Sequence, residues 1–410
     1  MNFQSLLYLA IILLTGCGKG DHSFNIQDEG GTEIIVEPNV SYFLQKQAGF
    51  TNEPTFKEAL NQLNSHQTVK GPEFIKLFLA KLQELKPGRH LASYFATTNK
   101  SKYDYKMSNT ELEKKLIEAF SLEMDRAEVV LKARFEKFGL EQFNVINLGN
   151  AFRIELGGEY DLQRIRGVVQ AYANFGFYMT HDPLVVYEKY LIQADKILAE
   201  LASSNDTIIQ RDSTLDESRD ANHPILKYLY PNLQIGERGR KSFGSGALIG
   251  WVQSKDTSVF LHLLKSDPVR LLLPRDLHFA FAYKTEEQGM GLYCIKGHGI
   301  NSPEIDQESV TSAHLSKNES SGSPTINLQF NVEAADKWAQ LTRENIGKSI
   351  LVVLDKSVLM APFVESEIPN GNTVISGNFT LQEAQDLAGI LNVGSMPLPL
   401  RIVSETTIKK

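Results

Sequence analysis

The chain has 410 residues, of which 42% are hydrophobic and 22% are charged, a balance typical of a globular protein. Its net charge of −7 is spread along the sequence, without the basic stripe that nucleic-acid-binding proteins carry. We therefore expect two or three folded domains and no nucleic-acid partner.

The amino terminus carries a short apolar run at residues 6–14, which is too short for the roughly 20 residues that cross a bilayer as a helix. The sequence Leu-Thr-Gly-Cys follows directly and ends at Cys17. An apolar residue, two small residues and a cysteine form the lipobox at which bacterial lipoproteins are lipidated and cleaved. We predict a signal peptide at residues 1–16 and a lipid on Cys17. The alternative is an ordinary secretory signal with a chance cysteine, because residues 1–4 lack the usual Lys or Arg.

This prediction places the protein in the cell envelope, anchored by its lipid to the outer or inner membrane and facing the periplasm. Residues 17–23 would be a short polar tether. The lipid would be its contact with the membrane, since no later segment reaches the length of a membrane span. The other cysteine, Cys294, lies in a strand-like stretch, where a buried structural thiol is the expected form.

The first half of the chain alternates strands and helices. Two helices, at 55–64 and 72–85, interrupt this pattern after its first strand. A further helix, at 184–201, follows the last strand of the pattern. The order strand, helix, strand, strand, helix, strand is that of a split βαβ or ferredoxin-like unit. We therefore predict a ferredoxin-like base domain at residues 24–203, built from elements at 32–37, 108–138, 143–148, 151–156, 162–173 and 175–179.

An acidic stretch without apolar periodicity, residues 204–222, is predicted to be a linker. Beyond it, an α+β head domain is predicted at residues 223–395, and residues 396–410 contain a last strand that returns to the base. Thr380 and Glu383 form a capping box that predicts a helix up to Leu391. The remaining predicted elements are strands at 247–252, 277–283, 290–296, 310–316, 325–331, 349–354, 374–376 and 398–404, and helices at 256–264 and 334–345.

The residues offer little support for catalysis. The nine histidines include no pair at the i, i+4 spacing of a helical metal site. The glycine-rich residues 244–250 precede a strand instead of opening a helix, so a flexible joint is favoured over a phosphate-binding turn. We therefore predict no catalytic residue, no metal site and no cofactor, although a triad can form from residues distant in sequence.

The carboxy-terminal third carries a series of motifs. They are the segment 331–348, Leu351-Val-Val-Leu-Asp355, Ala361-Pro362, Ile368-Pro-Asn-Gly371, Ile375-Ser-Gly-Asn-Phe379, Glu383-Ala384, Leu387-Ala388 and Gly394-Ser-Met-Pro397. Together these motifs resemble the head of the first periplasmic domain of SecD, a membrane subunit that assists protein export. Further back, the segments starting at Arg134 and Arg153 resemble the base of that domain, so the similarity covers residues 24–405. The resemblance implies a ferredoxin-like base with an inserted head and a last strand that returns to the base.

The sequence also departs from that family. Lys356 stands where a glycine is expected, and Met360 where a small hydroxyl residue is usual. In the family, membrane helices with proton-coupling residues follow this domain, whereas the present sequence ends at Lys410. We therefore expect a stand-alone lipoprotein that acts by binding its partners and transmits no proton-driven movement.

Two functions remain open. The first is a non-catalytic accessory factor in protein export, whose head binds translocating or unfolded polypeptide close to the Sec translocase. The second is a cell-envelope binding lipoprotein that holds a fixed protein partner and has no link to the translocase. The resemblance favours the first function without identifying the residues that bind a partner.

Overall fold

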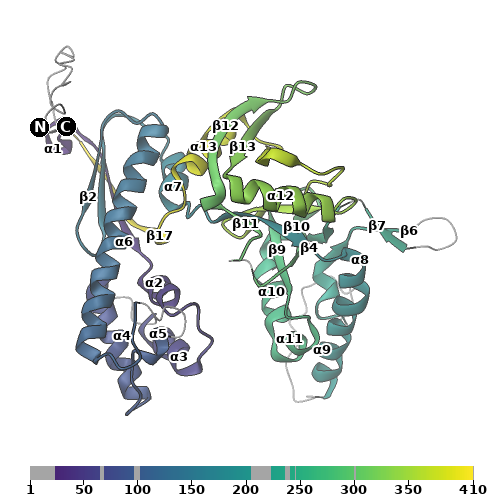
Figure 1. Cartoon of the computed structure of the whole chain (residues 1–410), viewed down its shortest axis with the longest axis horizontal. Helices are drawn as coiled ribbons and strands as arrows, with labels where there is room; N and C mark the ends of the chain where they lie inside the picture. The colour runs from purple at the N-terminus through teal and green to yellow at the C-terminus, as the bar shows by residue number, and fades with distance from the viewer. Residues whose placement is uncertain are drawn as a thin grey trace, which may run out of the picture.

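A computed structural model describes residues 24–64, 69–96, 102–204, 223–235, 241–244, 246–299 and 302–409. The predicted signal peptide, Cys17, the tether and residues 205–222 of the predicted linker lie outside the described residues. Figure 1 shows two lobes, with the base on the left and the head on the right. Helices and strands are mixed throughout, so the predicted α+β class is confirmed.

The base contains a four-stranded antiparallel sheet in the order β17-β1-β3-β2. In chain order, the sheet and its two helices follow the strand, helix, strand, strand, helix, strand pattern of a split βαβ unit. Asn150 and Gly149, at φ 80°, lie in the predicted tight turn between two of the strands. The elements are β1 (Gly31–Pro38), α6 (Asn109–Lys137), β2 (Phe143–Asn147), β3 (Phe152–Leu156), α7 (Leu162–Gln170) and β17 (Leu400–Ile408).

The prediction that residues 175–179 supply the fourth base strand is wrong. β4 (Phe175–Thr180) pairs instead with β14 (Ile350–Leu354) in the sheet of the head, and β17 takes the fourth place in the base. The first four residues of β4 are all buried, which suits a strand inside a large sheet. The mostly exposed β17 suits an edge position.

The predicted base boundary at residue 203 needs the same correction. The helical segment after β4 comprises α8 (Pro183–Val185), a π-helical stretch (Val186–Leu191) and α9 (Ile192–Ser204). It packs with α11 (Asp267–Leu272) and shares one hydrophobic cluster with the head. Residues 175–204 therefore belong to the head.

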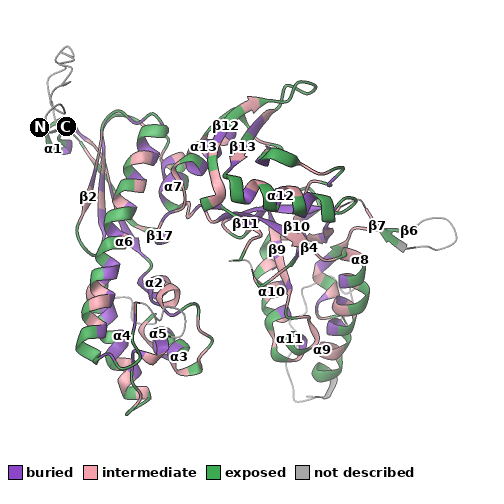
Figure 2. Ribbon diagram, viewed as in Figure 1, coloured by how far each residue is buried: buried purple, intermediate pink, exposed green. Residues whose placement is uncertain are grey.

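Four helices are inserted between β1 and α6, at the bottom of the base in Figure 1. They are α2 (Val40–Gln47), α3 (Pro54–Asn64), α4 (Gly71–Leu85) and α5 (Ser93–Ala96). Two of them, α3 and α4, were predicted, whereas α2 and α5 are too short for a clear periodic pattern. Figure 2 shows buried residues along the inward sides of these helices.

The head is centred on an eight-stranded sheet in the order β11-β4-β14-β15-β9-β10-β8-β5. An additional pairing of β10 with β4 closes five of the strands into a ring. Tyr178, Ile295 and Leu351 belong to a small buried cluster contributed mainly by these strands. The strands not yet bounded are β5 (Leu229–Pro231), β8 (Leu248–Val252), β9 (Leu277–Glu286), β10 (Gly289–Lys296), β11 (Ile305–Asp306) and β15 (Ser357–Met360).

Below this sheet in Figure 1 lie α9, α10 (Thr257–Lys265) and α11, and a short pair formed by β6 (Leu233–Ile235) and β7 (Lys241–Phe243) lies beside it. Above it lies a second layer with a three-stranded antiparallel sheet in the order β12-β13-β16. The capping box predicted at Thr380 and Glu383 is confirmed. The elements of the upper layer are β12 (Val310–Lys317), β13 (Pro324–Phe330), α12 (Val332–Glu344), β16 (Asn372–Ser376) and α13 (Leu381–Val393).

The chain crosses between base and head twice, at residues 171–174 and 394–399. Arg134, fully buried on α6, donates hydrogen bonds to backbone carbonyls on both sides of this joint. Burial lowers the pKa of its guanidinium to about 10, although Asp355 opposes that shift. The three acceptors are the carbonyl oxygens of Val168, Ala171 and Gly394.

Asp355 fixes the first crossing from the head side. Its carboxylate accepts hydrogen bonds from the backbone N–H groups of three successive residues, Tyr172, Ala173 and Asn174. Asp355 and Lys356 form the two-residue turn between β14 and β15, with φ values of 49° and 72°. The glycine expected at 356 would suit this left-handed backbone, so Lys356 is a strained substitution.

Candidate functional site

The upper layer of the head contains a groove of about 790 Å³ between α12 and the segment that leads into β16. Apolar side chains of Phe330, Ala335 and Ala339 contribute to its lining, as does Val332, which is 82% exposed. The charged lining residues are Asp336, Arg343, Glu344 and Glu367, which is three carboxylates against one guanidinium. The groove therefore combines apolar surface with an excess of negative charge.

The amphipathic character of α12 creates this groove. Asn331 caps the helix by accepting a hydrogen bond from the Ala334 backbone N–H at 2.9 Å. Ala334, Trp338 and Leu341 are buried against the head, so the neighbouring positions face outward. The sequence of this helix thus places its small residues, Ala335 and Ala339, along the groove.

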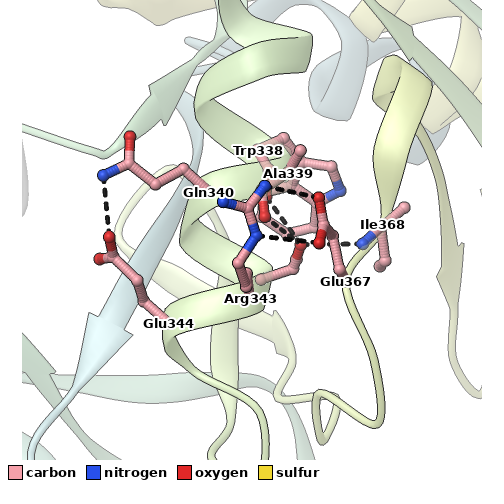
Figure 3. Close-up of polar contacts among 8 residues, drawn as sticks. Trp338, Ala339, Gln340, Arg343, Glu344, Glu367 and Ile368 are labelled. Atoms are coloured by element: carbon pink, nitrogen blue, oxygen red, sulfur yellow. Dashed lines mark hydrogen bonds and ion pairs between the residues drawn. The ribbon is translucent and has the colours of Figure 1, made fainter.

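Arg343 of α12 and Glu367 of the segment before β16, which forms the wall of the groove, make a bidentate ion pair (Figure 3). The nitrogen–oxygen distances are 2.9 and 2.7 Å, and the pair lowers the pKa of the Glu367 carboxyl. Beneath it, the Thr342 hydroxyl donates to the Trp338 carbonyl and accepts from the Ile368 backbone N–H. These contacts hold the wall of the groove in place before any ligand arrives.

The groove wall ends at Gly371, a position where a side chain would not fit. Its φ is 65°, and a Cβ at this position would lie 2.6 Å from the Cβ of Ala335. The close approach lets the segment lie directly on α12. The motif Ile-Pro-Asn-Gly that ends at Gly371 therefore has a structural explanation in the groove.

Aromatic rings pack together beneath the groove. Trp338 contacts Phe177 at 4.6 Å and Phe330 at 5.8 Å between ring centroids. Phe177 and Phe330 also meet edge to face. Phe330, which lines the groove, is therefore packed against the aromatic core of the head.

The two sides of the groove lie in the motifs at 331–348 and 368–371, but the sequence analysis identified no partner-binding residue in them. The groove arises from α12 meeting the segment before β16, and no local pattern reports that contact. Cys17, the predicted lipidation site, lies outside the described residues. Cys294 is buried as predicted, and burial raises the pKa of its thiol to about 12.

The glycine-rich stretch 244–250 lies where a strand begins, as expected. Gly250 is part of β8, and a Cβ there would lie 2.2 Å from the Tyr230 carbonyl oxygen of β5. Within the described ranges, no group of three or more His, Cys, Asp or Glu residues could hold a metal ion. No helix in the described part of the chain is both long and apolar enough to cross a membrane.

A family profile described as the SecDF P1 head subdomain matches residues 292–398, which include the groove. The protein translocase subunit SecD of Rhodothermus marinus is 27% identical over 402 residues, covering 93% of this chain and 61% of that protein. The SecD subunit of Aquifex aeolicus is 30% identical over 281 residues, covering 66% of this chain and 52% of that protein. The chain thus spans between half and two thirds of the length of these relatives.

Solved structures of SecDF give weaker similarity. A crystal structure of SecDF in its super-membrane-facing form is 15% identical, with a TM-score of 0.41, and the match covers 93% of this chain and 31% of that one. A second solved structure, of SecDF described as a membrane component that enhances protein export, is 19% identical, with a TM-score of 0.37. The match covers 69% of this chain and 92% of that one. The sequence comparisons show that the chain is similar to SecD along most of its length.

Proposed function

We propose that this SecD-related chain is a non-catalytic accessory factor in protein export that binds unfolded polypeptide in the groove beside α12. Two observations support the proposal. The chain is related to translocase subunits along most of its length, and the groove lies in the part that matches the P1 head subdomain.

The chemistry of the groove suits an unfolded segment better than a small ligand. Its lining mixes apolar residues with polar ones such as Gln329 and Gln340, without a convergent set of groups for one compound. A polypeptide offers both apolar side chains and backbone polar groups, so it can satisfy such a surface without sequence specificity. The preformed wall at Arg343 and Glu367 lowers the cost of ordering the protein on binding.

The proposal includes the lipid on Cys17. A diacylglyceryl or triacyl anchor holds a protein stably on a membrane, whereas one acyl chain binds only marginally. Mass spectrometry of the membrane-extracted protein should show a lipidated cysteine at the new amino terminus, and a Cys17→Ala variant should leave the membrane fraction. An unmodified Cys17 would refute this part alone.

Binding is tested by filling the groove at Ala339. Ala339→Phe adds a ring to the lining, whereas Ala339→Ser keeps the groove open and serves as the matched control. We expect the phenylalanine variant to bind an unfolded secretory precursor about tenfold more weakly than the wild type, with the serine variant unchanged. Equal binding by all three proteins would exclude the groove. Stoichiometric recovery of one folded envelope protein, with no precursor binding, would favour the alternative role as a fixed-partner lipoprotein.

A further inference from the structure

The three-stranded sheet beside the groove has two edges. They differ in whether their outward backbone N–H and C=O groups have hydrogen-bond partners. β13 lies in the middle, with β12 on one side and β16 on the other. An unpaired edge presents a row of N–H and C=O groups to any extended chain. The hydrogen bonds of Ala313 and Ser376 identify the backbone groups that point outward on each edge.

The edge at β12 is closed by a side chain. Asn392 of α13 accepts a hydrogen bond from the Ala313 N–H at 2.8 Å and donates one to the Ala313 carbonyl at 2.5 Å. The amide thereby imitates a neighbouring strand at the centre of β12. No further strand can pair there without displacing α13.

Among the described residues, no side chain hydrogen-bonds to the backbone at the centre of β16 in the way that Asn392 does on β12. The Ser376 N–H reaches the sulfur of Met360 at 3.3 Å, so it points away from β13. Backbone direction repeats every second residue along a strand, so the N–H and C=O of Val374 point away as well. The register agrees, because Ala313 faces outward opposite Leu328, which places Asn327 and Val374 in a non-hydrogen-bonded pair.

Val374 is 52% exposed, and no backbone hydrogen bond joins it to any described residue outside its sheet. The groove lies beside this strand, since Gln329, which lines the groove and pairs with Asn372 of β16, donates to the Asn370 carbonyl in the groove wall. The edge at β16 is therefore adjacent to the groove.

We propose that an extended segment of unfolded polypeptide binds by adding a strand to β16 at Val374, with Lys or Arg side chains in the adjacent groove. Backbone pairing supplies affinity independent of sequence. The excess of carboxylates at Asp336, Glu344 and Glu367 over Arg343 favours a basic segment. This inference rests on the proposed function, and it specifies the binding mode and the preferred charge of the substrate.

The test uses the purified full-length chain and two short unstructured peptides, one rich in lysine and one in which glutamate replaces each lysine. Val374→Pro removes the outward N–H while leaving the internal ladder intact, and edge strands tolerate such a proline. Val374→Ala keeps the N–H and is the matched control. We expect Val374→Pro to weaken binding of the lysine peptide about tenfold, and Val374→Ala to bind as the wild type does.

Hydrogen exchange of the wild-type protein provides a second measurement that does not depend on the folding of a variant. The lysine peptide should slow exchange at residues 372–376, and the glutamate peptide should bind more weakly. Unchanged affinity of a folded Val374→Pro protein, unchanged exchange at β16 or equal affinity for both peptides would overturn the inference and leave groove binding intact. Absence of binding by the wild type to either peptide and to the precursor would overturn the proposed function itself.

Discussion

Arg134 of α6 donates a hydrogen bond to the backbone carbonyl of Gly394, 260 residues further along the chain. The same guanidinium donates to the Val168 carbonyl of α7 and to the Ala171 carbonyl at the first crossing between the lobes. A single buried cation therefore holds both connections of the head to the base. The head, which contains the groove, is therefore joined to the base through connections that Arg134 holds.

Replacement of this cation should destabilise the protein strongly. Arg134→Met keeps the apolar stem but leaves three carbonyls without their donor. We expect a loss of at least about 3 kcal/mol in the free energy of unfolding, measured by urea denaturation. Arg270→Met, at an arginine whose side chain is 72% exposed, is the control and should change stability by less than about 0.5 kcal/mol. Equal effects of the two changes would show that Arg134 does not hold the joint.

Glycine at position 356 should stabilise the protein. Lys356 has φ 72° in the turn between β14 and β15, a conformation that costs a residue with a Cβ about 1 kcal/mol relative to glycine. Lys356→Gly should therefore raise the midpoint of thermal unfolding. Lys317→Gly, at the end of β12, provides the comparison, since no positive φ is present there. A lower midpoint for Lys356→Gly would indicate that the lysine side chain has a role that outweighs the strain.

Cys294 should be unreactive in the folded protein. The thiol is buried and donates to the His181 carbonyl, and burial raises its pKa to about 12, so little thiolate forms at pH 8. In a Cys17→Ser chain, a disulfide reagent should label Cys294 only after urea unfolds the protein. Rapid labelling under native conditions would mean that β10 opens readily.

Glu383 should contribute to acid sensitivity. Lys284 and the Thr380 N–H lower the pKa of this carboxyl below its unfolded value of 4.5. Its contribution to stability is therefore present above pH 4.5 and is lost as pH falls through the lower folded-state pKa. Glu383→Gln should flatten the decline of stability between about pH 5 and 3, whereas Glu319→Gln at the hairpin tip should not. An unchanged slope would show that the capping carboxylate is not linked to folding.

Local patterns predicted the elements well. The expected helix at 108–138 is α6 at Asn109–Lys137, because its apolar spacing persists over its whole length. The capping box at Thr380 is present because cap and partner lie three residues apart. Apolar spacing and capping pairs depend only on residues close together in the sequence. They can therefore be recognised without knowledge of the fold.

The sheet assignments could not be predicted in the same way. β4 follows the base helix α7 closely, yet its partner β14 lies far along the sequence, and nothing local to Phe175 specifies that pairing. The groove is equally non-local, since it requires Gly371 to lie on Ala335. The Lys356 departure was visible in the sequence, but its meaning emerged only from the positive φ.

The central claim is that polypeptide in transit contacts the groove, and crosslinking in living cells tests it most directly. A photoreactive residue at Val332, 82% exposed at the groove, is compared with one at Leu271, 84% exposed on α11 in the lower part of the head. We predict crosslinks from position 332 to secretory proteins during their export, and few from position 271. Equal labelling at the two positions, or no secretory protein captured at 332, would contradict the account.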